Sequence, residues 1–266
     1  MKEIKKVKLF VNHNSRSREV EKETRAILLE EGFEIVEEND FDLGIAIGGD
    51  GSFLRMVNES DFKKDALYVG INAGTLGFAQ DIRVDEVKDF IKSVKKNEFF
   101  YEDIGVQTVL IESKEGTTKF QSLNEILVRE EELNTIHLDA YIDGVLLENF
   151  VGDGLLISTS FGSTAYNLNY GGSIVDNAFD TLQITPIAPM SNKTYRSLAN
   201  SVIIPSTKTI TIVPKSGTDN LLITTDGRNY FYTEVTKVET HIKNHIHLIR
   251  KQDYNYIKKI NDKFIK

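Results

Sequence analysis

The sequence predicts two domains of different fold class: an α/β domain with a parallel sheet in residues 1–100 and a β-sandwich in residues 101–244. In the first part, short apolar segments alternate with segments of helical periodicity, which is typical of parallel strands joined by helices. In the second part, many short strand-like segments follow one another, over a length that suits a β-sandwich. Residues 254–265 return to helical spacing, and we expect this helix to pack back on the first domain, which a segment of about 245–266 would complete. Its apolar positions are Tyr254, Ile257, Ile260 and Phe264.

The strands expected in the first domain are short apolar runs. They are residues 7–11, 33–36, 43–47 and 67–71. A helix with Val20 and Leu28 on its apolar face is expected to end at Gly32, and a second helix is expected over residues 84–97. Ligands bind beyond the C-terminal ends of the strands in such sheets. Two glycine-rich segments, after residues 47 and 71, lie at such ends.

The second domain is expected to consist of short strands joined by tight turns. The strands are residues 106–111, 120–128, 137–142, 145–150, 155–158, 202–204, 209–213, 221–225 and 230–232. Asp143 and Asp226 are each followed by glycine, and both pairs have the composition of hairpin turns. Residues 162–170 and 193–198 are expected to be helical.

The composition is that of a globular chain with an acidic balance. The 266 residues carry a net charge of −8, which argues against non-specific binding to nucleic acid or to an anionic membrane. A small anionic ligand could still meet a few local cations. The chain has no cysteine, which excludes disulfides, thiolate catalysis and zinc held by cysteine. Without a run of about 18 apolar residues or a signal-peptide pattern, a cytoplasmic protein is expected.

The segment 45–54 is organised around Gly48-Gly49-Asp50-Gly51, between a buried strand and a helical segment. Glycines let the main chain approach a bound group, and N–H groups at a helix N-terminus suit phosphate. Asp50 would repel phosphate, so we expect it to handle a proton or a metal ion carried in with the phosphate. The alternative is that Asp50 only caps the helix.

Two better-known phosphate-binding loops are excluded. The chain contains no G-x-x-x-x-G-K-[ST], and its first half has no G-x-G-x-x-G after a strand. A nucleotide-binding protein with this sequence is therefore neither a Walker-type ATPase nor a standard dinucleotide fold.

Asn124 and Glu125 interrupt an apolar run. Asn is unfavourable in strands, and a buried Glu is costly unless it is paired. A ligand hydroxyl or amine would account for both residues. The alternative is an edge bulge with Glu125 in solvent, and the local pattern alone favours that alternative.

Residues 152–172 form the longest unusual stretch, in which a strand enters a Ser/Thr-rich turn and a short helix begins near Ser163. A helix N-terminus after a flexible turn, with hydroxyl donors nearby, again suits a polar ligand. Tyr166 could stack on a base or hydrogen-bond a ribose. The alternative is a capped helix with Tyr166 in the core.

Three histidines, His241, His245 and His247, lie close together near the C-terminus. Strand alternation places His245 and His247 on one face, an arrangement that metal sites use, but no carboxylate pattern accompanies them. We expect surface histidines and no resident metal site.

Four blocks, in this order and spacing, resemble the bacterial NAD kinase family. They are Gly48-Gly49-Asp50-Gly51, Asn72-x-Gly74-x-Leu76-Gly77-Phe78, Asn124-Glu125, and Asp153-Gly154 through Ser158-Thr159 to Gly162-Ser163-Thr164-Ala165-Tyr166. The first block is also similar to diacylglycerol and sphingosine kinases, whereas the last two are much more specific. The resemblance extends from about residue 43 to Asp226. It implies ATP-dependent phosphorylation of the adenosine-ribose 2′-hydroxyl of NAD, an α/β domain with a β-sandwich, and a homo-oligomer, either a tetramer or a dimer.

The resemblance also implies roles for single residues. Asp50 matches the family's proton acceptor, and the amides of Gly48, Gly49 and Gly51 would hold the ATP phosphates together with Mg²⁺ or another divalent cation. The positions that match the family's substrate contacts are Gly51, Leu54, Asn72, Phe78, Asn124, Glu125, Asp153, Ser163, Thr164, Ala165, Tyr166, Asn167, Asn169, Ala188 and Asp226.

Among these positions, Asn124 and Glu125 match the pair that holds NAD, and Tyr166 would lie beside the adenosine. Ala188 falls where the family contacts the adenine from a neighbouring loop. Asp226 looks like the acidic residue that a partner subunit can contribute.

Two positions depart from the family pattern. Val151 stands where many members have a basic residue, which puts one substrate contact in doubt. Arg228 stands where many have glutamine, and it could restore a positive charge. Two functions of other classes compete with NAD kinase: a lipid or sphingoid kinase with the same glycine loop, and a non-catalytic NAD(P)-binding sensor that would tolerate loss of Asp50.

Overall fold

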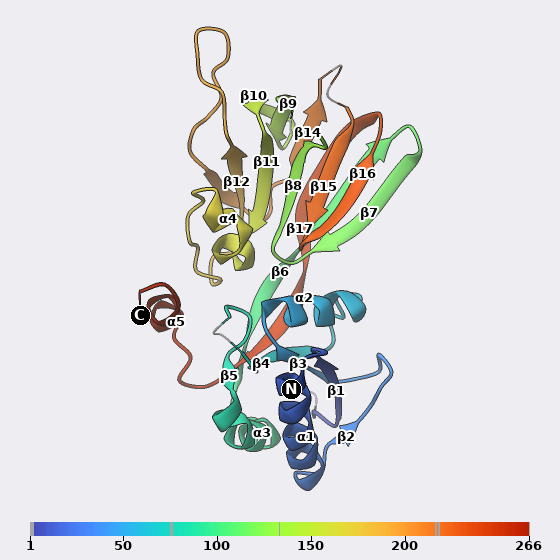
Figure 1. Cartoon of the computed structure of the whole chain (residues 1–266), viewed down its shortest axis with the longest axis vertical. Coiled ribbons are helices and arrows are strands. Elements are labelled where there is room, and N and C mark those ends of the chain that lie inside the picture. The colour runs from blue at the N-terminus through green and yellow to red at the C-terminus, as the bar shows by residue number, and fades with distance from the viewer. Residues whose placement is uncertain (1–2, 75–76, 133, 216, 218, 266) are drawn as a thin grey trace. The chain divides into compact units, whose positions relative to one another are not determined.

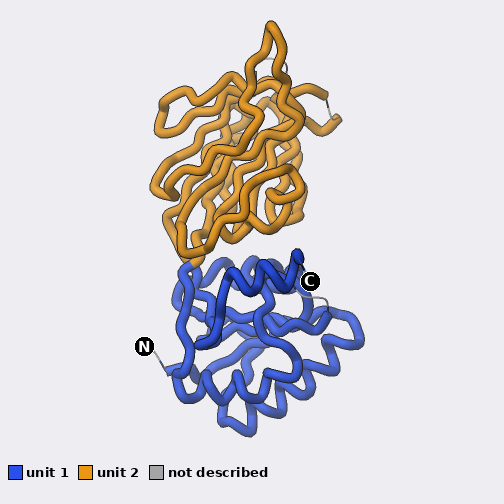
Figure 2. Tube along the Cα trace, turned by 90° about the vertical axis from the view of Figure 1, so that its left-hand side faces the viewer, with its two compact units in different colours: residues 1–103, 246–266 blue, residues 104–245 orange. Residues whose placement is uncertain are grey.

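The computed structural model describes residues 3–74, 77–132, 134–215, 217 and 219–265. The chain forms two compact units (Figure 2). Unit 1 is Met1–Asp103 with Ile246–Lys266, and unit 2 is Ile104–His245. The predicted fold class is confirmed, because unit 1 is α/β, unit 2 is built of β-strands, and the C-terminal helix belongs to unit 1.

Unit 1 contains a parallel sheet with helices after its strands (Figure 1). The strands are β1 (Lys6–Val11), β2 (Glu34–Ile35), β3 (Leu43–Gly48), β4 (Leu67–Asn72) and β5 (Ile82–Arg83), and the helices are α1 (Ser15–Glu30), α2 (Asp50–Glu59), α3 (Val87–Lys95) and α5 (Tyr256–Phe264). The order in the sheet is β2-β1-β3-β4, and β5 and the end of β17 (Val235–Arg250) also pair with β4. Every residue of β3 is buried, as expected for a central parallel strand, and β3 leads directly into α2.

Unit 2 contains two sheets (Figure 1), and apolar side chains from both sheets form one core. One sheet runs β13-β12-β11-β8-β15-β16, and the other runs β10-β9-β14-β17 with β6 and β7 attached. The bounds are β6 (Phe100–Ser113), β7 (Gly116–Ser122), β8 (Glu125–Glu130), β9 (Ile136–Ile142), β10 (Val145–Gly152), β11 (Gly154–Thr159), β12 (Thr181–Ile187), β13 (Val202–Pro205), β14 (Ile210–Pro214), β15 (Leu221–Thr225) and β16 (Arg228–Tyr232). A 3₁₀ turn, Phe161–Thr164, and the short α4 (Tyr166–Asn169) follow β11.

The two hairpin turns predicted from Asp-Gly pairs are present. Asp143 and Asp226 have φ of 47° and 45°, and the following glycines have φ of 79° and 80°. Two successive residues with positive φ are the requirement of the tightest hairpin turns, and Asp and Gly tolerate it best. One turn joins β9 to β10 and the other joins β15 to β16.

Two expectations in unit 2 are wrong, and one strand was missed. Residues 193–198 are not helical, because this segment folds onto β10, where the Ser197 hydroxyl bonds the main chain of Val151. The expected strand 120–128 is divided, with β7 ending at Ser122 and β8 beginning at Glu125. Strand β12 is absent from the expected strands, and its Gln183 and Thr185 side chains are buried and hydrogen-bonded.

The apolar face expected for the C-terminal helix is partly wrong. Residues 246–250 continue β17, and the helix itself is α5. Its buried residues are Tyr256 and Lys259, whereas Ile257 is 67% exposed. The helix therefore faces the rest of unit 1 with a lysine. In the part of the chain that the structure describes, no helix is both long and apolar enough to cross a membrane.

Candidate active site

Asp50 is the first residue of α2, and its carboxylate is held by a neighbouring loop of unit 1. The main-chain N–H of Phe78 donates to Oδ2 and that of Ala79 donates to Oδ1, each at 2.9 Å. The Lys263 ammonium lies 3.9 Å from Oδ2, and the Asp50 side chain is 41% exposed. The carboxylate is therefore fixed in orientation and open to solvent at once.

The capping alternative for Asp50 is wrong. The N-cap of α2 is Gly49, and no side chain caps this helix. The Asp50 carboxylate bonds instead to residues 28 and 29 positions further along the chain. Gln80 strengthens the same connection, because its Nε2 donates to the Gly49 carbonyl at 2.7 Å. Gln80 was not predicted as a site residue, because no local sequence pattern indicates a contact with Gly49, 31 positions earlier in the chain.

The glycines of the loop have different surroundings. A Cβ on Gly48 would collide with the Ser52 hydroxyl, and one on Gly77 would collide with the Asp50 carboxylate. Gly49 and Gly51 would meet nothing within 4 Å, so the main chain there is open to a ligand. The N–H groups in the first turn of a helix have no acceptor within it, which makes this end of α2 suitable for phosphate.

The other predicted residues of unit 1 lie near this loop or on α2. Asn72 ends β4 in register with Gly48, and its Oδ1 accepts from the Gly74 N–H at 2.9 Å. Leu54 is half-buried on α2. Phe78 is half-buried, with its ring 5.3 Å from that of Phe264. Two members of the motif, Thr75 and Leu76, lie outside the described residues.

In unit 2, Glu125 begins β8 in the interior of a sheet. β8 pairs with β11 on one side and β15 on the other, and Glu125 is only 7% exposed. The alternative of a solvated glutamate at an edge is therefore wrong. Burial, and then repulsion from Asp226, raise the pKa of Glu125 to about 8, although a hydrogen bond from the Tyr166 main chain opposes this. Glu125 is thus largely protonated at neutral pH.

Asp226 holds the segment that contains Asn124. Its carboxylate accepts from the Ser122 hydroxyl and from the main-chain N–H groups of Leu123 and Asn124, each at 2.8 Å. Burial raises the pKa of Asp226, and these hydrogen bonds oppose the shift. The structure thus brings Asn124, Glu125, Tyr166 and Asp226 together within one unit. Within the chain, Asp226 acts as an anchor for the neighbouring turn.

The residues after β11 divide into buried and exposed groups. Ser163 and Asn167 are fully buried, and both are hydrogen-bonded within the unit. Their side chains support the turn and do not face solvent. Tyr166 is 41% exposed, so the alternative of a core tyrosine is wrong, and its hydroxyl lies 2.9 Å from that of Tyr170. Asn169 is also exposed, and Thr164 and Ala165 are half-buried.

Asp153 and Ala188 are exposed residues on adjoining segments. The Asp153 N–H donates to the Ile187 carbonyl, and a Cβ on Gly152 would meet the carbonyls of Ile187 and Ala188. The side chain of Val151, which stands at the family's basic position, is buried. Arg228 is exposed at the start of β16.

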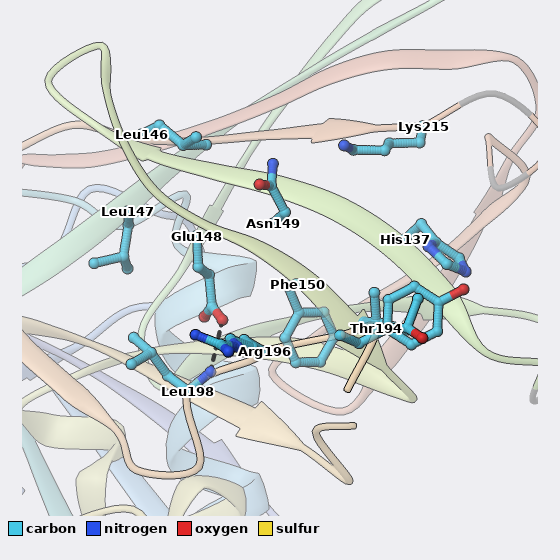
Figure 3. A pocket seen from close by; sticks show the side chains of 12 residues that line it. His137, Leu146, Leu147, Glu148, Asn149, Phe150, Thr194, Arg196, Leu198 and Lys215 are labelled. Atoms are coloured by element: carbon cyan, nitrogen blue, oxygen red, sulfur yellow. Dashed lines mark hydrogen bonds between the residues drawn. The ribbon is translucent and has the colours of Figure 1, made fainter. Parts of the chain in front are cut away.

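A cavity of about 530 Å³ lies along β10 (Figure 3). It is lined by His137, residues 146–151, residues 194–196, Leu198 and Lys215. Figure 3 shows the Glu148 carboxylate pointing toward the main chain of Leu198, whose N–H donates to it at 2.9 Å. Burial raises the pKa of Glu148. Among the described residues that line this cavity, none is a predicted site residue.

The expectation of surface histidines is wrong for His241, which is 8% exposed, whereas His245 and His247 are partly exposed beside carboxylates. His245 Nε2 lies 3.0 Å from Asp180 and His247 Nδ1 lies 2.6 Å from Asp103. Within the described ranges, no group of three or more His, Asp or Glu side chains is arranged to hold a metal ion.

Comparison with known proteins explains this arrangement. The ATP-NAD kinase N-terminal domain matches residues 1–99, and the ATP-NAD kinase C-terminal domain matches residues 123–244. The chain belongs to the ATP-NAD kinase family. An NAD kinase from Finegoldia magna is 35% identical, and the match covers 97% of each chain. One from Streptococcus gordonii is 32% identical, over 98% of this chain and 96% of that protein.

Two solved structures share the fold. The yeast NADH kinase complexed with NADH has a TM-score of 0.86 and 21% identity, over 98% of this chain and 88% of that one. The NAD kinase from Archaeoglobus fulgidus in complex with ATP has a TM-score of 0.77 and 19% identity, over 96% and 98%. The resemblance drawn from the four sequence blocks is confirmed, and membership of the ATP-NAD kinase family does not support a lipid kinase or a non-catalytic sensor.

Proposed function

We propose that the chain transfers the terminal phosphoryl group of ATP to the adenosine-ribose 2′-hydroxyl of NAD, giving NADP, and that Asp50 receives the hydroxyl proton. The observation that carries this proposal is the Asp50 carboxylate, exposed to solvent at the start of α2 and oriented by two main-chain N–H groups. Each carboxylate oxygen has a second lone pair available for a substrate hydroxyl.

This arrangement suits the chemistry of the reaction. A ribose hydroxyl is a poor acid at neutral pH, and a positioned base typically contributes about 10²–10⁴-fold to the rate. Phosphoryl transfer has a loose transition state, so most acceleration comes from positioning and charge stabilisation. The two N–H groups from Phe78 and Ala79 fix the direction in which Asp50 presents its lone pairs.

The phosphoryl donor is assigned to the glycine loop. The open main chain at Gly49 and Gly51, with the N-terminus of α2, offers N–H donors to phosphate oxygens. Amide N–H groups do not ligate a cation, and the described residues offer no cluster of three acidic or histidine side chains for one. A divalent cation such as Mg²⁺ would therefore be held mainly by the ATP phosphates. When bound, this cation would neutralise part of the negative charge of the ATP phosphates.

The acceptor is assigned to Asn124, Glu125 and Tyr166. Glu125 Oε2 is buried and has no hydrogen-bond partner among the described residues, which is costly unless a ligand supplies one. A protonated carboxyl both donates and accepts, so it suits a ribose hydroxyl. The exposed ring of Tyr166 is available to stack on an adenine.

The test is a coupled assay of the purified chain with NAD, ATP and Mg²⁺, in which an NADP-specific dehydrogenase detects the product. We expect NADP from the wild type, and about 10²–10⁴-fold lower kcat for Asp50→Asn, with KM for NAD changed only a few-fold. Failure of the folded wild-type protein to form NADP with any phosphoryl donor would overturn the reaction. An Asp50→Asn variant that keeps most of kcat would overturn the role of Asp50.

We further propose a cytoplasmic homo-oligomer, either a dimer or a tetramer. Several large apolar side chains of unit 2 are exposed, as expected of a surface that associates. They include Val145, Leu146, Phe179 and Phe231. Light scattering of the purified protein should give a multiple of the chain mass, and a monomer at micromolar concentration would contradict the proposal.

A further inference from the structure

Residues 77–82 connect Asp50 on one side to the C-terminal helix on the other. On the first side, the Phe78 and Ala79 N–H groups bond the Asp50 carboxylate. On the second side, the Lys259 ammonium of α5 donates to the Phe78 carbonyl and to Asp81 Oδ1. The loop that orients the catalytic carboxylate is thus itself held by α5.

The two sides meet at a single peptide group. The carbonyl of Phe78 and the N–H of Ala79 belong to the same planar peptide. Lys259 bonds the oxygen end and Asp50 bonds the hydrogen end. A hydrogen-bond donor on the carbonyl oxygen fixes the plane of the peptide and polarises it, which strengthens its N–H as a donor.

Lys259 is an unusual residue for its place. It is 9% exposed, in a row of the helix where an apolar side chain would be expected. Its charge is balanced in a buried network, because Arg250 binds both Asp81 and Glu102 while Lys259 shares Asp81. Burial and the nearby Arg250 lower the pKa of Lys259, whereas Asp50 and Glu102 oppose that shift. The hydrogen bond to Phe78 needs only an N–H, which the amine has in either state.

An apolar side chain of the same length would pack α5 without the cost of burying a charge. The lysine is therefore explained by two bonds that an apolar residue could not make, one to Asp81 and one to the Phe78 carbonyl, and only the second reaches the peptide that orients Asp50. We propose that Lys259 is a positioning residue for phosphoryl transfer, which orients Asp50 through the Phe78–Ala79 peptide. This inference rests on the role proposed above for Asp50.

The test compares Lys259→Met with Lys258→Met, a control from the exposed side of the same helix. In Lys259→Met we expect kcat to fall about 10-fold, with KM for NAD and ATP within about two-fold, because only orientation of the base is lost. Lys258→Met should keep kcat. In an Asp50→Asn background, Lys259→Met should change the residual rate by less than about two-fold, since both residues act through one carboxylate.

A merely structural lysine would behave differently in this cycle. It would lower the rate by the same factor in both backgrounds, and that result would overturn the inference, as would a folded Lys259→Met with wild-type kcat. If Asp50→Asn is itself as active as the wild type, the role of Asp50 fails first and the inference fails with it.

A second readout does not depend on turnover. Hydrogen exchange at the Phe78 and Ala79 amides should become faster in Lys259→Met than in Lys258→Met, because both amides lose their fixed acceptor geometry. Unchanged exchange would overturn the inference. Should Lys259→Met fail to fold, Lys259→Gln keeps a polar group that ends one bond short of the ammonium, and the same outcomes are expected of it.

Discussion

Asp50 and Glu125 are carboxylic acids in two of the four sequence blocks that resemble the NAD kinase family, yet their surroundings are opposite. Asp50 is exposed over 41% of its side chain and receives two main-chain N–H bonds. Glu125 is 7% exposed, and one of its oxygens has no hydrogen-bond partner in the described part of the chain. Each unit thus prepares its carboxyl group for a different task.

The difference follows from the elements that carry the two residues. Asp50 lies at a helix start that opens to solvent, and the 77–82 loop turns its N–H groups toward it. Glu125 lies in an internal strand, where water is excluded and Asp226 adds a second negative group. The first environment orients a carboxyl group toward solvent, and the second favours a neutral carboxyl that can donate a hydrogen bond.

The largest effect within this comparison is expected from the loop that holds Asp50. In Gly77→Ala the new methyl group would collide with the Asp50 carboxylate, so the carboxylate must move or rotate. Because an error of about 1 Å in a reacting group can cost about 10²-fold, we expect kcat to fall roughly 10–100-fold. Steady-state kinetics of NADP formation measures it.

Gly74→Ala is the matched control, since a methyl group there would meet nothing within 4 Å. It should retain kcat within about two-fold, because no group has to move. Equal activity of the two variants would show that the orientation of Asp50 does not limit the reaction.

A smaller effect on activity, and a larger one on stability, is expected from substitution of Asp226, which holds the segment next to Glu125. Asp226→Ala removes the acceptor of three donors in residues 122–124, and each buried donor left unpaired costs about 1–3 kcal/mol. We expect a loss of about 2–4 kcal/mol in the free energy of unfolding, measured with urea, and a rise of several-fold in KM for NAD.

Asp143→Ala is the control for that substitution. Asp143 occupies the same place in the other Asp-Gly turn with nearly the same φ. The strain of placing an alanine at positive φ should therefore be about equal in the two variants. Its carboxylate is partly exposed and bonds Lys208 and Thr209. A destabilisation of Asp143→Ala as large as that of Asp226→Ala would mean that backbone strain, and not the three hydrogen bonds, explains the loss.

Sequence reasoning succeeded in this molecule where the signal is local. The strand and glycine turn before α2 and the two Asp-Gly hairpins follow from short stretches of residues, and the structure contains them. The partners of Asp50 could not be found in this way, because they lie 28 and 29 positions away in sequence. The burial of Glu125 was also missed, since a local pattern does not reveal whether a strand is internal or at an edge.

The buried face of the C-terminal helix could also not be predicted from local sequence. Its period was visible, but the face chosen from apolar residues includes Ile257, which is exposed. The buried face contains Lys259, because the acidic partner Asp81 and the Phe78 carbonyl lie opposite it. A hydrophobic pattern identifies the face of a helix only where the surface that it covers is also apolar.

The smallest effect on activity is expected at Glu125 itself. Because the pKa of Glu125 is about 8, the native state keeps a proton that an unfolded chain, with a glutamate pKa near 4.5, releases. The native state then binds more protons than the unfolded state between these two values, so the stability of the wild type should fall as pH rises from about 4.5 to about 8.

A glutamine at position 125 imitates the neutral form of the glutamate at every pH. Glu125→Gln should therefore change KM for NAD at pH 7 by less than about three-fold and should flatten this pH dependence of thermal stability. Glu115→Gln, in an exposed hairpin, should keep the wild-type slope. If Glu125→Gln retained the full slope, or lost NAD binding at pH 7, the glutamate would have to be ionised in the folded protein, and the contrast between the two carboxyl groups would disappear.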